Sequence, residues 1–139
     1  MGVCDSNPAL QGLKLLLVDD NLDNLVAVRD ILQLSGIIVT YVETVQAAME
    51  VLQSSLPDII LCDIRLPDEF GYALTRQLRT LPAEQGGNIP AIAMTGLATE
   101  LDRQRCLDAG FQVYLAKPLN VEQLLTVILH LTQAPSMTL

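Results

Sequence analysis

The sequence is poor in positive charge. Its 139 residues include 8 lysines and arginines against 16 aspartates and glutamates, so the net charge is −8 at neutral pH. A chain this acidic repels nucleic acid and anionic membranes, and we expect direct binding to neither. It tolerates basic partners and bound cations.

Cysteine is scarce as well. The three cysteines, Cys4, Cys62 and Cys106, are irregularly spaced. An odd number at such spacing is neither a disulfide framework nor a zinc site. Free thiols are typical of a reducing compartment, and we therefore expect a cytoplasmic protein.

Long apolar runs are also missing. No run approaches the roughly 20 residues that a membrane-spanning helix needs, and the N-terminus lacks the pattern of a signal peptide. The runs that do occur, residues 13–18 and 59–62, are short and are followed by aspartate. This pattern is typical of buried parallel strands.

Strand-like and helix-like segments alternate along the chain. We expect strands at residues 13–18, 37–42, 58–62, 90–94 and 112–115, and helices at 22–34, 44–53, 71–81, 99–109 and 121–131. Five such βα units with short connections imply an α/β fold with one parallel sheet and helices on both faces, a doubly wound (βα)5 sandwich. The expected organisation is a flexible leader at 1–12, one domain at 13–132 and a tail at 133–139.

Polar residues gather where the expected strands end. The first strand is followed by Asp19 and Asp20, the third by Asp63 and the fourth by Thr95, and Lys117 comes shortly after the fifth. In doubly wound folds the functional site lies beyond the carboxyl ends of the strands. Three carboxylates, one hydroxyl and one ammonium are therefore expected at a single edge of the sheet.

Carboxylates that meet at one edge repel each other, by about 4 kcal/mol for two charges ~4 Å apart at an effective dielectric constant of 20. A lysine offsets part of this repulsion, and a divalent cation offsets the rest. Mg²⁺ prefers oxygen ligands and also draws charge from a phosphoryl group. An ionised carboxylate can be the nucleophile that forms an aspartyl phosphate, because phosphoryl transfer needs mainly positioning and charge neutralisation.

Three motifs carry a resemblance to a known family. They are Leu16-Leu17-Val18-Asp19-Asp20-Asn21, then Asp63-Ile64-Arg65-Leu66-Pro67 with Gly71, and Tyr114-Leu115-Ala116-Lys117-Pro118. Together they resemble the receiver (response regulator) domains of two-component signalling, over about residues 13–132. The Asp-Asn-Leu-Asp-Asn-Leu run at 20–25 is most similar to receivers of hybrid histidine kinases. The resemblance implies a flavodoxin-like, five-stranded sheet in the order 2-1-3-4-5.

The resemblance also implies which residues hold the metal and the phosphoryl group. Asp63 is the expected phosphoacceptor. Asp20, Asp63 and the backbone carbonyl of Arg65 are the expected direct ligands of Mg²⁺, for which Mn²⁺ can substitute. Asp19 is expected to act on the ion through a bound water.

A second group of residues is expected to respond to phosphorylation. By the same resemblance, Thr95 turns its hydroxyl to the new phosphoryl group and Lys117 pairs with that group. Tyr114 then swings into the space that Thr95 vacates. The Lys117–Pro118 peptide bond is expected to be cis, the isomer that is accessible at proline.

The function implied is that of a phosphoacceptor in a two-component phosphorelay, which accepts its phosphoryl group from a sensor histidine kinase or a phosphotransfer protein. Such a chain is a signalling module rather than an enzyme, since it catalyses only its own phosphorylation and dephosphorylation. The helix expected at 121–131 carries more apolar residues than a single core-facing stripe needs. A homodimer through the fourth helix, fifth strand and fifth helix is therefore a further expectation.

The residues beside the site lead to one kinetic hypothesis. Arg65 and Leu97 occupy the two variable positions that tune hydrolysis in this family. The apolar Leu97 gives an attacking water no polar guide, so slow self-hydrolysis is expected. A phosphorylated half-life of seconds would contradict it.

Three other functions compete with this interpretation. An aspartate-nucleophile phosphatase usually has a second Asp two residues after the nucleophile, where this chain has Arg65. A pseudo-receiver that never takes phosphate does not need the full set of acids with Thr95 and Lys117. A flavodoxin-like cofactor binder needs a phosphate-cradling loop after the first strand, where this chain has Asp19 and Asp20.

Overall fold

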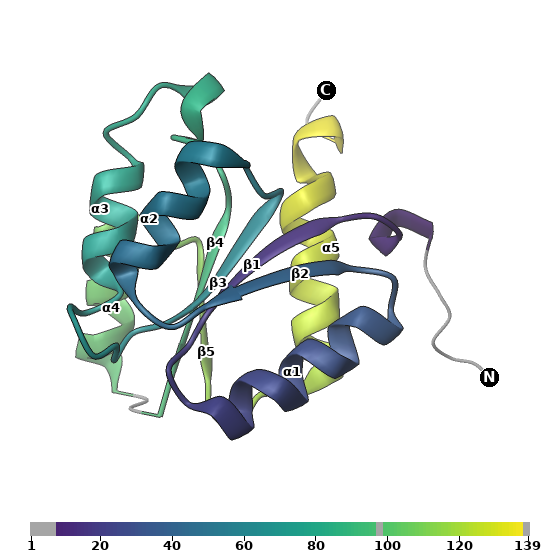
Figure 1. Cartoon of the computed structure of the whole chain (residues 1–139), viewed down its shortest axis with the longest axis horizontal. Helices are drawn as coiled ribbons and strands as arrows, with labels where there is room; N and C mark the ends of the chain where they lie inside the picture. The colour runs from purple at the N-terminus through teal and green to yellow at the C-terminus, as the bar shows by residue number, and fades with distance from the viewer. Residues whose placement is uncertain (1–7, 97–98, 138–139) are drawn as a thin grey trace.

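Five parallel strands form one sheet in the order β2-β1-β3-β4-β5 (Figure 1). The computed structural model describes residues 8–96 and 99–137. Its strands are β1 Lys14–Val18, β2 Ile38–Val42, β3 Ile59–Asp63, β4 Ala91–Thr95 and β5 Val113–Ala116. The strand order and the parallel pairing confirm the expected topology.

Helices cover both faces of the sheet. They are α1 Leu22–Leu34, α2 Val45–Ser54, α3 Tyr72–Leu78, α4 Glu100–Ala109 and α5 Val121–Met137, with short 3-10 turns at η2 Pro8–Leu10 and η3 Ala83–Gln85. In Figure 1, α1 and α5 lie on one side of the sheet and α2, α3 and α4 on the other. The doubly wound architecture is therefore confirmed. Among the described residues, no helix combines the length and the apolar character needed to cross a bilayer.

The core has two halves, one on each side of the sheet. Along β1, Leu15 and Leu17 pack toward α1 and α5, whereas Leu16 and Val18 pack toward α2, α3 and α4. This alternation follows from the two-residue period of a strand. All residues of β3 and β4 are buried, as expected for central strands covered on both faces. The carboxyl ends of these strands, Asp63 and Thr95, are therefore buried as well.

The folded unit extends beyond both expected boundaries. Leu10 is only 4% exposed and belongs to the core between the sheet and α5, and the Gly12 N–H donates to the Gly36 carbonyl at 2.9 Å. The unit thus begins before residue 13, because one apolar side chain anchors a segment whose composition resembles a loose leader. At the other end, α5 continues to Met137, past the expected end at residue 131.

Candidate functional site

The register of the sheet brings two of the predicted acids level with each other. Val18 of β1 pairs with Cys62 of β3, so the next residues, Asp19 and Asp63, come side by side at the carboxyl edge. Both are buried, whereas Asp20 is exposed at the mouth of the site. One carboxylate oxygen from each of the three acids lies within 4.8 Å of the others. The acidic cluster predicted from the strand ends therefore exists.

Lys117 connects this cluster to the segment after β5. Its Nζ donates to Asp63 Oδ2 at 2.8 Å and lies 3.5 Å from Asp19 Oδ2. Its backbone N–H donates to the Thr95 carbonyl at 2.8 Å, and the Lys117–Pro118 peptide bond is cis, as expected. The lysine is thus fixed at both its backbone and its side chain.

The electrostatics of the site follow from burial and from this ion pair. Burial raises the pKa of the Asp63 carboxyl, and the Asp19 charge adds to the rise, against the lowering effect of Lys117 and of the Arg65 N–H. Burial alone would lower the pKa of Lys117, but its bonds to Asp63 and Asp19 raise it overall. Lys117 is therefore a permanent cation near neutral pH. Three carboxylates facing one ammonium leave an excess of negative charge, which a cation would relieve.

The loop after β3 shapes the other side of Asp63. The Arg65 N–H donates to Asp63 Oδ1 at 3.1 Å, so both carboxylate oxygens have a donor. The Gly71 N–H donates to the Ile64 carbonyl at 2.7 Å, which closes the loop back onto the strand. A Cβ at Gly71 would lie 2.6 Å from the Asp63 carbonyl oxygen. Glycine is required there because the backbones approach so closely.

Asp68 is a residue of this loop that sequence reasoning missed. Its carboxylate accepts hydrogen bonds from the N–H groups of Val45 at 3.1 Å and Gln46 at 3.0 Å, while Thr44 caps α2 through the Ala47 N–H. Burial raises the pKa of the Asp68 carboxyl, but these bonds and one from the Glu69 N–H together outweigh burial and lower it overall. Asp68 thereby anchors the loop to the N-terminus of α2. No local signal marks this contact, because the two segments meet only in the folded chain.

Thr95 and Tyr114, the two residues predicted to form a switch, lie on the neighbouring strands β4 and β5. Ala93 pairs with Tyr114, and Thr95 lies two residues further along β4, so Thr95 and Tyr114 share one face of the sheet. Thr95 is 4% exposed. Tyr114 is half-buried against the core on the α2–α4 side, where burial and the Asp102 charge raise its pKa. Their movement stays a prediction, and Leu97 lies outside the described residues.

Known proteins share both the sequence and the fold of this chain. The sequence model of the response regulator receiver domain matches residues 15–129. The chain is 35% identical over 119 residues to an uncharacterised 14.6 kDa protein of Leptolyngbya boryana, covering 86% of this chain and 89% of that protein. It is 33% identical over 120 residues to the sensor protein GacS of Pseudomonas syringae, covering 86% of this chain but only 13% of GacS.

Among solved structures, the receiver domain of the sensor histidine kinase PA1611 from Pseudomonas aeruginosa superposes with a TM-score of 0.80 and 36% identity. The match covers 87% of this chain and 98% of that domain, which holds a magnesium ion in its active-site cleft. The family match, the strand order and the acidic edge agree with one another. This chain belongs to the response regulator receiver domain family of two-component signalling.

Proposed function

We propose that this chain is the phosphoacceptor of a two-component phosphorelay and that Asp63 receives the phosphoryl group. The observation that carries the proposal is the setting of the Asp63 carboxylate. One oxygen accepts from Lys117 Nζ at 2.8 Å and the other from the Arg65 N–H at 3.1 Å, with Asp19 and Asp20 beside them. A nucleophile held this way has one orientation, which is what an in-line transfer needs.

The donor set fits magnesium. The carboxylates of Asp20 and Asp63 and the carbonyl of Arg65 would hold the ion, and Asp19 would act through a water. All of these are oxygen donors, which suit Mg²⁺ and also Mn²⁺. When bound, the ion supplies charge neutralisation for the incoming phosphoryl oxygens.

The protein's own groups complete the transfer. A carboxylate oxygen of Asp63 forms the bond to phosphorus as the bond from phosphorus to the donor group breaks, and the donor keeps that electron pair. Lys117 balances the charge that arrives on the phosphoryl oxygens, and the hydroxyl of Thr95 donates to one of them. Tyr114 moves toward the space beside Thr95, which carries the change to the surface. The chain acts as a signalling module rather than as an enzyme on other substrates.

The proposed phosphodonor is a sensor histidine kinase or a phosphotransfer protein, and the expected cytoplasmic location stays a prediction. A homodimer through α4, β5 and α5 also stays a prediction. Every apolar side chain of α5 from Val121 to Leu131 is buried or half-buried within the single chain, so packing accounts for much of its apolar width. Sedimentation with and without beryllofluoride tests the dimer directly.

The decisive experiment measures intact mass after incubation with acetyl phosphate and Mg²⁺. The wild-type chain should gain one phosphoryl group, and Asp63→Asn should gain none. Asp58→Asn is the matched control, since Asp58 binds the Lys14 N–H at the opposite end of the sheet. Phosphorylation retained in Asp63→Asn would refute the assignment, and a wild-type chain that gains no mass would indicate a pseudo-receiver.

A further inference from the structure

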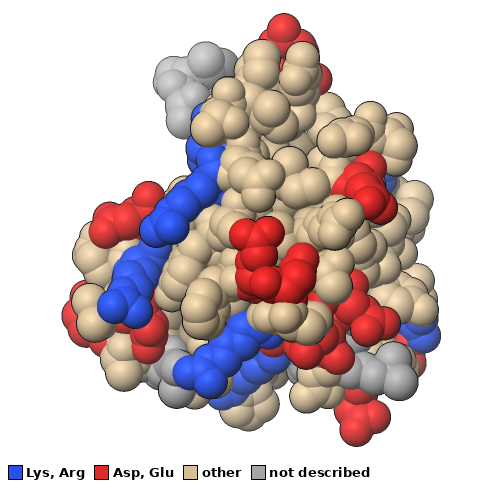
Figure 2. All heavy atoms as spheres, turned by 60° about the vertical axis from the view of Figure 1, so that its left-hand side comes forward, with Lys and Arg blue, Asp and Glu red and all other residues tan. Residues whose placement is uncertain are grey.

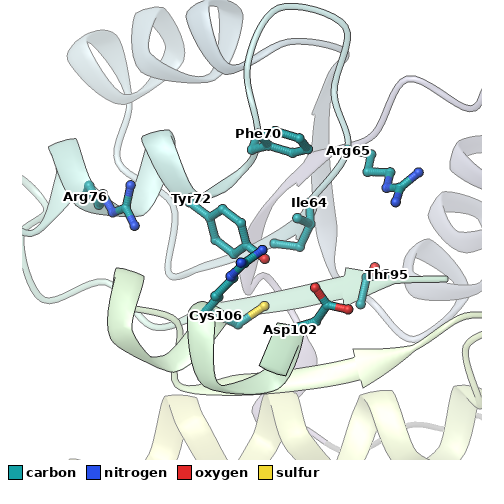
Figure 3. Close-up of a pocket in the computed structure, with 9 residues that line it drawn as sticks. Ile64, Arg65, Phe70, Tyr72, Arg76, Thr95, Asp102 and Cys106 are labelled. Atoms are coloured by element: carbon teal, nitrogen blue, oxygen red, sulfur yellow. The ribbon is translucent and has the colours of Figure 1, made fainter. Parts of the chain in front are cut away.

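A pocket of about 440 Å³ lies between the loop after β3, α3 and α4 (Figure 3). Arg65 comes from the loop, Arg76 from α3 and Arg105 from α4, and all three line the pocket. They are three of the eight cationic residues of a chain whose net charge is −8. Figure 2 shows lysines and arginines forming a broken band on the side of the molecule that carries α3 and α4.

These three guanidinium groups have no carboxylate partner among the residues that the structure describes. The ion pairs found there involve Arg29, Arg103 and Lys117 only. Asp102 also lines the pocket, where its carboxylate accepts the Thr99 hydroxyl at 2.6 Å, so three guanidinium groups face one carboxylate. An acidic protein that leaves three arginines unpaired around one hollow presents a site for an external anion.

The middle of the pocket is aromatic. Phe70 is 60% exposed, and its ring centroid lies 6.2 Å from that of Tyr72. The Arg76 guanidinium stands over the Tyr72 ring, 5.9 Å from its centroid, which orients the cation. In Figure 3, Arg76 and Arg65 lie at opposite ends of the group, with the two rings between them. The pocket thus offers guanidinium groups at both ends and two rings between them, with the Arg105 charge close to Tyr72.

We propose that this pocket docks an acidic peptide segment of a partner protein, in which carboxylates flank an aromatic or large aliphatic side chain. Guanidinium groups bind carboxylates bidentately, and exposed rings bind apolar side chains. A small anion would not reach both ends, whereas a short peptide does. Nucleic acid is disfavoured because a long polyanion extends past the pocket over a chain of net charge −8, whereas a short peptide keeps its carboxylates within the pocket.

Thr95 lines this pocket and also ends the strand beside Asp63. A change at the phosphoacceptor that moves Thr95 therefore alters the wall of the pocket. This coupling rests on the proposed function, whereas the docking itself does not.

The test is an NMR titration of the uniformly ¹⁵N-labelled full chain with the peptide acetyl-Asp-Glu-Phe-Leu-Glu-Asp-amide. We expect saturable shifts confined to amides around the pocket, with a dissociation constant near or below about 1 mM. The isosteric peptide acetyl-Asn-Gln-Phe-Leu-Gln-Asn-amide should bind at least about tenfold more weakly. Absence of saturable shifts, or equal binding of the neutral peptide, overturns the proposal.

Two variants locate the binding. The double variant Arg76→Gln, Arg105→Gln should weaken binding of the acidic peptide at least about tenfold. Arg103→Gln is the matched control, because Arg103 lies on the same helix but pairs with Glu100 at 3.0 Å. Equal weakening in the control would show non-specific attraction and refute the site.

Repeating the titration with Mg²⁺ and beryllofluoride should change the affinity by about threefold or more, and an unchanged affinity refutes only the coupling to Thr95.

Discussion

The acidic edge of the sheet and the basic pocket between α3 and α4 meet at Thr95, yet they handle charge in opposite ways. At the edge, Asp19 is 0% and Asp63 6% exposed, and Lys117 binds both. In the pocket, Arg76 and Arg105 are exposed and have no ion pair with any residue that the structure describes.

The difference has a physical origin. A buried charge must have partners at fixed positions, because it has lost its water. An exposed charge stays hydrated and needs no partner for the fold. Fixed charges suit chemistry that requires one geometry, and hydrated charges suit recruitment of a ligand from solution. The two regions can therefore serve one signalling event as its reactive part and its contact part.

The largest expected effect is at Lys117. Lys117→Met removes the ammonium that pairs with Asp63, so the rate of phosphorylation by acetyl phosphate should fall by about 10²-fold or more. The rate is measured by intact mass over time. Lys14→Met is the matched control, since Lys14 is the other lysine and is exposed at the far end of β1. An equal loss in that variant would mean that general positive charge, not the fixed ion pair, assists the reaction.

The next effect concerns magnesium. Asp19→Asn removes a carboxylate that we expect to hold the ion through a water, and Mg²⁺ affinity should fall by about 10- to 100-fold. Calorimetric titration measures the affinity. Asp23→Asn changes an acid in the first turn of α1 that lies outside the cluster, and it should leave the affinity nearly unchanged. Unchanged affinity in Asp19→Asn would remove Asp19 from the metal site.

A smaller effect tests the anchor of the β3–α3 loop. Asp68→Ala removes the acceptor for two N–H groups of α2, and the free energy of unfolding should fall by about 1 kcal/mol. Chemical denaturation measures it, with the neighbouring Glu69→Ala as control.

The same variant has a pH signature. The pKa of Asp68 is lower in the folded chain than its ordinary value. Its contribution to stability is therefore fully present above the ordinary carboxyl pKa, and it is lost as the pH falls through the lowered folded pKa. The difference in the free energy of unfolding between the wild type and Asp68→Ala should therefore become smaller as the pH falls over that acidic range. A difference in the free energy of unfolding that does not depend on pH would mean that the ionised carboxylate of Asp68 is not what caps α2.

The smallest effect is expected in the basic pocket. Arg105→Gln removes an exposed guanidinium without an ion pair in the described structure, so the free energy of unfolding should change by less than about 0.5 kcal/mol. The same denaturation experiment measures it. A decrease in the free energy of unfolding as large as that of Asp68→Ala would show that Arg105 stabilises the fold. It would contradict the distinction between the paired, buried charges of the acidic edge and the hydrated charges of the pocket.

Much of this protein follows from its sequence. Short apolar runs that end in aspartate predicted the parallel strands, because a strand covered on both faces has no polar side. The positions of Asp19, Asp20, Asp63, Thr95 and Lys117 at strand ends then predicted one shared site, because parallel strands end at one edge. The helices expected at 44–53 and 99–109 correspond to α2, which Thr44 caps at its N-terminus, and α4, which ends at Gly110.

Tertiary structure decided the rest. Leu10 joins the core although its surroundings resemble a leader, and Asp68 caps the N-terminus of α2 through N–H groups that lie 22 and 23 residues earlier in the chain. The basic pocket forms only because α3 and α4 lie side by side, which brings Arg76 and Arg105 around one hollow. Local pattern determines which segments become strands and which residues end them. Contacts between distant segments depend on packing in three dimensions, and no short-range signal records them.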